Sequence, residues 1–204
     1  MTRVLSTIVL LTIGFFSHNL FADKDAEAVI TRFHDSVITM MKTEGYGARL
    51  AFMNPVIKRD FDTRTIASVS LGRHWKTLSD EEQDEITELL VVVLASGYAS
   101  RLPPYSDHQF EICSSTPIIP DRTIIKCKLT SSSDTMKYDY QLVEHDGQWK
   151  IFDIVVGGVS DLAAKRGSYI ETFAAKGLEG VIAEIEQSII NNSLRYDSIR
   201  AGSD

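Results

Sequence analysis

Asp153 is the residue whose surroundings most suggest chemistry, because it lies in the middle of the apolar stretch WKIFDIVVGGVS. An ionised carboxylate among apolar side chains is costly to bury unless it is paired or hydrogen-bonded. One interpretation makes Asp153 a general base, with Tyr138 or Tyr140 donating a hydrogen bond to an oxyanion, as in an isomerase. The favoured interpretation pairs Asp153 with Arg166, because most buried charges pair internally. Arg166 could instead hold a ligand phosphate.

The other side chains that commonly do chemistry form no recognised constellation. Five histidines are scattered along the chain. His34 and Asp35 are interpreted as polar side chains on the protein surface rather than a catalytic dyad, since adjacent helical residues point in different directions. The sequence has no HExxH, CxxC or GxSxG motif and no phosphate-binding glycine loop. We therefore predict no enzymatic activity, no metal site and no cofactor.

The two cysteines, Cys113 and Cys127, flank SSTPIIPDRTIIK, in which two prolines and Asp121 favour a turn between two strands. In an antiparallel pair of strands centred near Pro120, the two cysteine side chains would face each other. In an oxidising compartment this arrangement predicts a disulfide. The alternative is a pair of buried free thiols.

The N-terminal residues 1–22 have the layout of a secretory signal peptide, with a basic start, a short apolar run and a more polar stretch ending at Ala22. The apolar run is too short to span a membrane. Cleavage after Ala22 would leave a single domain over residues 23–192 and a polar tail, 193–204, that is expected to be disordered. The formal charge of −7 argues against a nucleic-acid partner.

Apolar spacing and capping signals predict helices in the first half of the chain and at its end. The longest helix opens with a capping box at Ser79 and Glu82 and is apolar nearly all round, so it must be covered on more than one side. In the helix after Ser160, Arg166 falls inside the apolar stripe. The expected helices span about residues 25–42, 48–59, 63–72, 80–102, 161–177 and 178–190.

From Phe110 onward the apolar period changes to that of strands. The stretch MKYDYQLVEHDGQWKIFDIVV predicts a hairpin around a two-residue turn at Asp146 and Gly147. The pairs expected from that turn are Leu142 with Ile151, Tyr140 with Asp153, and Tyr138 with Val155. Helices, then antiparallel strands, then helices indicate an α+β fold. Because the last strand is apolar on both faces, one face of a bent sheet could line a pocket.

Two stretches carry motifs that can be compared with a known family. FDTRTIASVSLGRHWKTLSDEEQDEITELLVVVLASGYASRL has a leucine-glycine and a tryptophan before LS..EQ, and its long helix ends in YA.RL. YDYQLVEHDGQWKIFDIVVGGVS is followed by an arginine, an aromatic residue and GLEGVIAEI. These motifs resemble the toluene-tolerance or MlaC-like family of periplasmic phospholipid-binding proteins over nearly the whole expected mature chain. The segment DLAAKRGSY departs from the usual LV.NYR..F and is closer to the hopanoid-associated branch of that family.

The resemblance implies a fold and a function. The implied fold is α+β, with a bent antiparallel sheet packed by helices, partly like the nuclear-transport-factor-2 cone, around an apolar lipid cavity. The implied function is that of a soluble periplasmic carrier, not an enzyme, that encloses phospholipid acyl chains. Such a carrier shuttles lipid between an inner-membrane ABC transporter with a lipid-binding domain and an outer-membrane lipoprotein complex, which maintains outer-membrane lipid asymmetry. Hopanoid transport, an isomerase of the same cone fold, and a ligand-free adaptor are the alternatives.

A carrier of this kind needs an apolar lining. We hypothesise that the lipid contacts come from the longest helix, the hairpin and the helix after it. The opposite face of the last strand, with Phe152 and Ile154, is the alternative lining, and Asp153 with Arg166 is either an ion pair or a headgroup contact. The expected lining residues are Leu90, Val93, Leu94, Tyr98, Tyr138, Leu142, Ile151, Val155, Tyr169 and Phe173.

Overall fold

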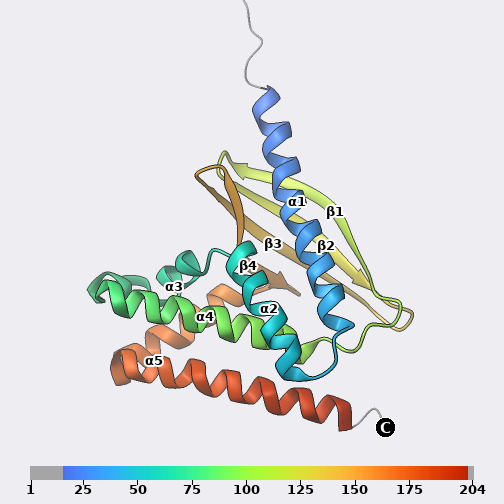
Figure 1. Cartoon of the computed structure of the whole chain (residues 1–204). Helices are drawn as coiled ribbons and strands as arrows, with labels where there is room; N and C mark the ends of the chain where they lie inside the picture. Colours follow the sequence, from blue (N-terminus) through green and yellow to red (C-terminus); the bar gives the residue numbers. More distant parts are fainter. Residues whose placement is uncertain (1–15, 202–204) are drawn as a thin grey trace, which may run out of the picture.

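The computed structural model describes the backbone of residues 16–201 and the side chains of residues 24–199. Helices come first along the chain, then an antiparallel sheet, then a long helix (Figure 1). The helices are α1 (Phe16–Met41), α2 (Tyr46–Asp60), α3 (Thr63–Leu71), the 3-10 helix η1 (Gly72–Thr77), α4 (Asp80–Arg101) and α5 (Asp161–Ala201). The strands are β1 (Gln109–Ile119), β2 (Arg122–Thr130), β3 (Thr135–His145), β4 (Gln148–Val156) and β5 (Val159–Ser160). The predicted α+β fold, with an antiparallel sheet packed by helices, is confirmed.

Local capping determines where the later helices begin. Asp62 accepts a hydrogen bond from the Thr65 backbone N–H at 2.9 Å and opens α3. Ser79 forms the predicted capping box at the start of α4. The hydroxyl of Ser160 accepts from the Ala163 N–H at 2.9 Å in the first turn of α5. Side-chain oxygens satisfy helix N–H groups that have no intrahelical partner, so these starts could be predicted from sequence.

The predicted signal peptide lies for the most part outside the described residues, 1–15 entirely so, and the predicted cleavage site after Ala22 falls within α1. Within the described part of the chain, no helix is long and apolar enough to cross a bilayer.

The sheet has the order β1-β2-β3-β4-β5, and every neighbouring pair is antiparallel. Helix α1 lies across one face, which we call the inner face, and contacts β1, β2 and β4 (Figure 1). Tyr138 marks this face because its hydroxyl lies 3.3 Å from Nε2 of His34 on α1. The opposite, outer face carries charged pairs such as Lys126 with Asp139, 3.5 Å apart. The sheet is therefore apolar mainly on its inner face.

A bulge in β1 separates the two cysteines. Ile112 pairs with Cys127 and Ser114 pairs with Lys126, so Cys113 falls in the register shift and has no residue opposite it on β2. Both cysteines are free, with Cys113 exposed and Cys127 buried. The predicted disulfide is therefore wrong, because the inserted residue takes Cys113 out of the pairing that a regular hairpin would give. Burial raises the pKa of the Cys127 thiol to about 12.

A second register shift lies in the β3–β4 hairpin. The predicted turn is present, with positive φ at both Asp146 and Gly147. Leu142 still pairs with Ile151 as predicted, but beyond this point β4 contains one extra residue. Three later pairs consequently differ from the predicted register: Gln141 pairs with Asp153, Tyr140 with Ile154, and Tyr138 with Val156. A one-residue shift moves each later side chain to the other face, so Asp153 and Val155 leave the face of Tyr138 and Ile154 joins it.

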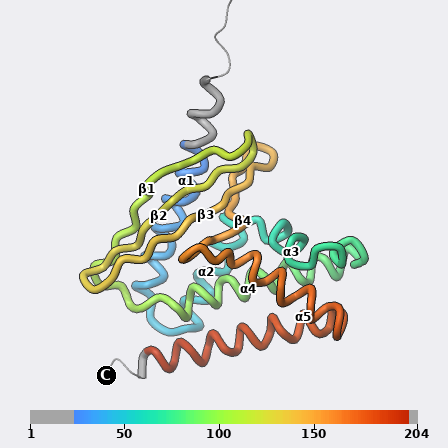
Figure 2. Tube along the Cα trace, turned by 180° about the vertical axis from the view of Figure 1, so that it is seen from behind, coloured from blue at the N-terminus to red at the C-terminus, as the bar shows by residue number. Residues whose placement is uncertain are grey.

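The helices α4 and α5 lie on the opposite side of the molecule from the β1–β2 edge (Figures 1 and 2). Helix α4 packs against α2, α3 and α5, which explains why it is apolar nearly all round. The two helices predicted after Ser160 are both present within α5, which turns sharply at Gly177, the predicted boundary, where φ is 68° and ψ is −165° (Figures 1 and 2). The expected disordered tail is wrong for residues 193–201, which continue α5. Its Tyr196 is buried, and the hydroxyl accepts from the Gly45 N–H at 3.0 Å.

Candidate functional site

Aromatic rings from four parts of the chain meet under the inner face of the sheet. Phe33 of α1 has its ring centroid 5.2 Å from Phe61, 5.2 Å from Tyr98 of α4 and 6.0 Å from Tyr140 of β3. All three contacts are edge-to-face, the geometry that the ring quadrupoles favour. We call Phe33, His34, Phe61, Tyr98, Phe110, Tyr138 and Tyr140 the aromatic cluster.

The polar groups of the aromatic cluster contact one another. His34 stacks on Phe110 with 4.3 Å between ring centroids, and its Nε2 lies 3.3 Å from the Tyr138 hydroxyl. The Tyr140 hydroxyl interacts with those of Tyr138 and Tyr98. Burial raises the pKa of all three tyrosines well above the usual value, since it disfavours the charged phenolate. At neutral pH the cluster therefore has hydroxyls and an imidazole but no charge on these groups.

His34 is buried, so its interpretation as a surface side chain is wrong. Burial lowers its pKa from 6.5 to about 4. The unfolded chain therefore binds a proton between these values that the folded chain does not bind. The stability present above pH 6.5 is lost as the pH falls towards 4, by up to about 3 kcal/mol.

This pH effect can be isolated with a His34→Gln variant, which keeps a polar partner for Tyr138 but cannot titrate. Urea unfolding of both proteins at several values between pH 7 and 4.5 gives the free energy of unfolding. We expect the free energy of unfolding of the wild-type chain to fall more steeply with decreasing pH than that of the variant. The reason is that only the wild-type chain takes up a proton at residue 34 when it unfolds in this pH range. Parallel curves would mean that His34 titrates normally in the folded chain.

The predicted lining residues do not all lie together. Tyr98 and Tyr138 belong to the aromatic cluster, and Leu142 and Ile151 are fully buried on the same face of the sheet. Leu90 and Val93 are buried on α4, and Leu94 is partly buried. Tyr169 and Phe173 belong to a different region, because Phe173 stacks on His74 of η1 at 4.3 Å and α5 packs there on α3. Val155 lies on the outer face.

Asp153 fastens the start of α5 to the sheet. One carboxylate oxygen accepts from the Leu162 backbone N–H at 3.0 Å, and the other accepts from the Ser160 hydroxyl at 2.7 Å and from Nε2 of Gln141 at 3.2 Å. The predicted pair with Arg166 is wrong, because the guanidinium donates instead to the Val69 carbonyl at 2.6 Å.

The register shift also separates Asp153 from the tyrosines. Asp153 pairs with Gln141 and shares its outer face, whereas Tyr138 and Tyr140 point to the inner face. A general base and an oxyanion donor must reach the same reacting group. The arrangement required for the isomerase interpretation is therefore not present at these residues.

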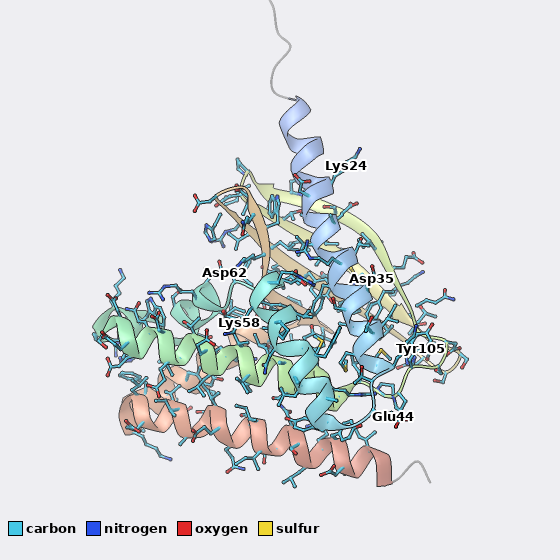
Figure 3. The ribbon with its side chains drawn as sticks, in the orientation of Figure 1. Lys24, Asp35, Glu44, Lys58, Asp62 and Tyr105 are labelled. Carbon is cyan, nitrogen blue, oxygen red and sulfur yellow. The ribbon has the colours of Figure 1, made fainter. Side chains whose placement is uncertain are left out.

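Phe61 also lines a surface cleft of about 270 Å³. Lys58 and Asp62 line it and lie near the C-terminal end of α2 (Figure 3). Several of its charges are paired, since Lys58 contacts Glu88 at 2.5 Å and Arg64 contacts Asp84 at 2.8 Å. The described residues contain no group of three or more His, Cys, Asp or Glu side chains that could hold a metal ion.

The predicted lining set omitted four members of the aromatic cluster: Phe33, His34, Phe61 and Phe110. For His34 a signal was present, because Ile30, His34, Val37 and Met41 recur at helical spacing along the face that α1 buries. Phe61 and Phe110 lie at element boundaries, where no periodicity indicates the direction of a side chain.

Comparisons with known proteins agree with this architecture. The model of a family described as MlaC protein matches residues 31–187. The intermembrane phospholipid transport system binding protein MlaC of Haemophilus influenzae is 22% identical over 123 residues, which is 58% of this chain and 58% of that protein. A phospholipid-binding protein from Ralstonia solanacearum, solved in complex with a phospholipid, has a TM-score of 0.71 at 16% identity. That match covers 83% of this chain and 99% of the solved chain, and at this identity it shows a shared fold.

Proposed function

The chain belongs to the MlaC protein family, and we propose that it is a periplasmic carrier that encloses phospholipid acyl chains and moves the lipid between the inner and outer membranes. The observation that carries this proposal is the aromatic cluster, an apolar interior built from α1, α4 and the inner face of the sheet. Its polar groups are neutral hydroxyls and one neutral imidazole. Such an interior can accept hydrocarbon without burying an unpaired charge.

Several apolar side chains packed against this core keep accessible surface, which is what a ligand could cover. Tyr98 and Leu94 on α4 are only partly buried, as are Phe110 and Ile112 on β1 and Ile154 on β4. The three strand residues lie on the inner face of the sheet, because they pair with Leu129, Cys127 and Tyr140. We infer that acyl chains lie against this set, with the headgroup left in water.

The energetics explain why a carrier must enclose the chains. Each methylene group exposed to water costs about 0.8 kcal/mol, so a lipid with roughly thirty methylenes would need more than about 20 kcal/mol to cross bare. An apolar interior removes most of that barrier. The proposed export by an N-terminal signal peptide would place the carrier in the compartment between the membranes.

The proposed partners rest on the similarity to the Haemophilus influenzae protein, which belongs to an intermembrane phospholipid transport system. We propose an inner-membrane ABC transporter and an outer-membrane lipoprotein complex as donor and acceptor. A role in hopanoid transport by the same mechanism is the second candidate, and it is favoured by the segment DLAAKRGSY after Ser160.

Native mass spectrometry of the protein purified from the periplasm tests the proposal. We expect one added mass in the range of a diacyl phospholipid, released on denaturation and identified by lipid analysis. A triterpenoid in its place would favour the hopanoid candidate. A protein that carries no lipid and takes none up from phospholipid vesicles would contradict both.

A further inference from the structure

The inner face of the sheet continues beyond the part that α1 covers. Directly opposed residues in neighbouring antiparallel strands point to the same face. The register therefore places one row of side chains across all five strands: Ile112, Cys127, Tyr138, Val156 and Val159. Because Tyr138 contacts His34, this row lies on the inner face and passes through the aromatic cluster.

Beyond the partly buried Ile112, exposure rises along this row from Cys127 to Val159. Cys127 is 2% exposed and Tyr138 7%, whereas Val156 is 44% exposed and Val159 66%. The next row of the same face behaves alike, since Leu129 is 8% exposed and its partner Met136 is 44% exposed. An apolar track therefore runs from the buried interior to solvent. We call its exposed end, Met136, Val156 and Val159, the lip.

The turn between two of the lip residues, Val156 and Val159, is exposed. Gly157 and Gly158 have φ values of 59° and 82°, a conformation that side-chain-bearing residues rarely adopt. A Cβ added at either glycine would meet no atom within 4 Å, so the turn projects into open space. From behind, the chain can be seen to leave β4 and turn back into α5 beside the sheet (Figure 2).

We propose that the lip is the portal through which an acyl chain enters and leaves the interior, sliding along Val159 and Val156 onto Tyr138. This inference rests on the proposed function. A single row of side chains that leads inward fits a narrow hydrocarbon chain. A protein partner fits poorly, because a specific interface uses about 20 to 30 residues on each side and the lip offers three.

A lipid-uptake assay tests the portal. The delipidated protein is mixed with vesicles of phosphatidylethanolamine and phosphatidylglycerol that contain a phospholipid with a fluorescent acyl chain, and the uptake rate is measured. We expect Val156→Asp with Val159→Asp to slow uptake at least tenfold while the final lipid content stays the same. Val159→Asp alone, at the more exposed position, should slow uptake by a smaller factor, and Val159→Leu should retain the wild-type rate.

Ile119→Asp is the matched control. Ile119 is 49% exposed and pairs with Arg122, whose side chain lies on the outer face, so the same substitution there is expected to change the uptake rate by less than twofold. Unfolding midpoints of all variants report whether the fold is kept.

The outcomes separate the portal from the carrier function. If the wild-type protein takes up no lipid, the proposed function fails and the portal fails with it. If the wild type loads and the double aspartate variant loads equally fast, the portal alone is overturned. Slower uptake from vesicles with unchanged uptake of a monomeric short-chain phospholipid would make the lip a membrane contact and also overturn the portal. Slower uptake of both lipids supports it.

Discussion

Replacing Arg49 by methionine is expected to lower the free energy of unfolding by about 3 to 5 kcal/mol. Arg49 is 1% exposed, and its guanidinium donates to the carbonyl oxygens of Met41, Thr43 and Leu102 at 2.8 to 2.9 Å. These carbonyls lie at the ends of α1 and α4, where backbone acceptors have no intrahelical donor. Methionine fills similar space but leaves the carbonyls without their charged donor.

Urea unfolding followed by circular dichroism measures the effect. Arg49→Lys should recover only part of the loss, because an ammonium cannot match a planar fork that reaches several carbonyls at once. Arg73→Met, at an exposed arginine of η1, is the control and is expected to change stability by less than about 0.5 kcal/mol. Equal effects at Arg49 and Arg73 would show that the buried guanidinium does not hold the two helix ends together.

Two bulges account for most of the errors in the sequence-based prediction. The hairpin turn at Asp146 and Gly147 and the helix caps were predictable, because local side-chain chemistry determines them. A bulge has no comparable signature, and one inserted residue reverses every later side chain on that strand. The insertion near Cys113 removed the disulfide. The insertion in β4 moved Asp153 and Val155 away from Tyr138.

The other errors come from contacts between residues far apart in sequence. The polar segment 193–201 was expected to be disordered, yet it is helical and Tyr196 binds the Gly45 N–H and lies over Arg49. Composition alone cannot reveal such a partner, because polar residues are equally suited to a solvated tail and to one face of a packed helix. Arg166 illustrates the same limit. The apolar stripe around it correctly predicted a helix, but its guanidinium donates to the Val69 carbonyl and not to Asp153.

Replacing Asp153 by alanine is expected to cost about 2 to 4 kcal/mol of stability. Asp153 is 7% exposed, and its loss leaves the buried Leu162 N–H without its acceptor and removes the partner of Ser160. Asp153→Asn should cost about half as much. The amide oxygen can still accept from the Leu162 N–H, but the NH₂ group would face another donor, Nε2 of Gln141.

Asp139→Asn provides the matched control on the same outer face. Its carboxylate is partly exposed and has a long ion pair of 3.5 Å with Lys126, which predicts a change of less than about 0.5 kcal/mol. If Asp153→Ala were no more destabilising than this control, the hydrogen bonds to the start of α5 would be dispensable. The graded loss from aspartate through asparagine to alanine would instead show that this carboxylate, which the sequence made a candidate base, acts by joining β4 to α5. The β4–β5 turn that carries Val156 and Val159 lies between those two elements, so the same substitution would also loosen the lip.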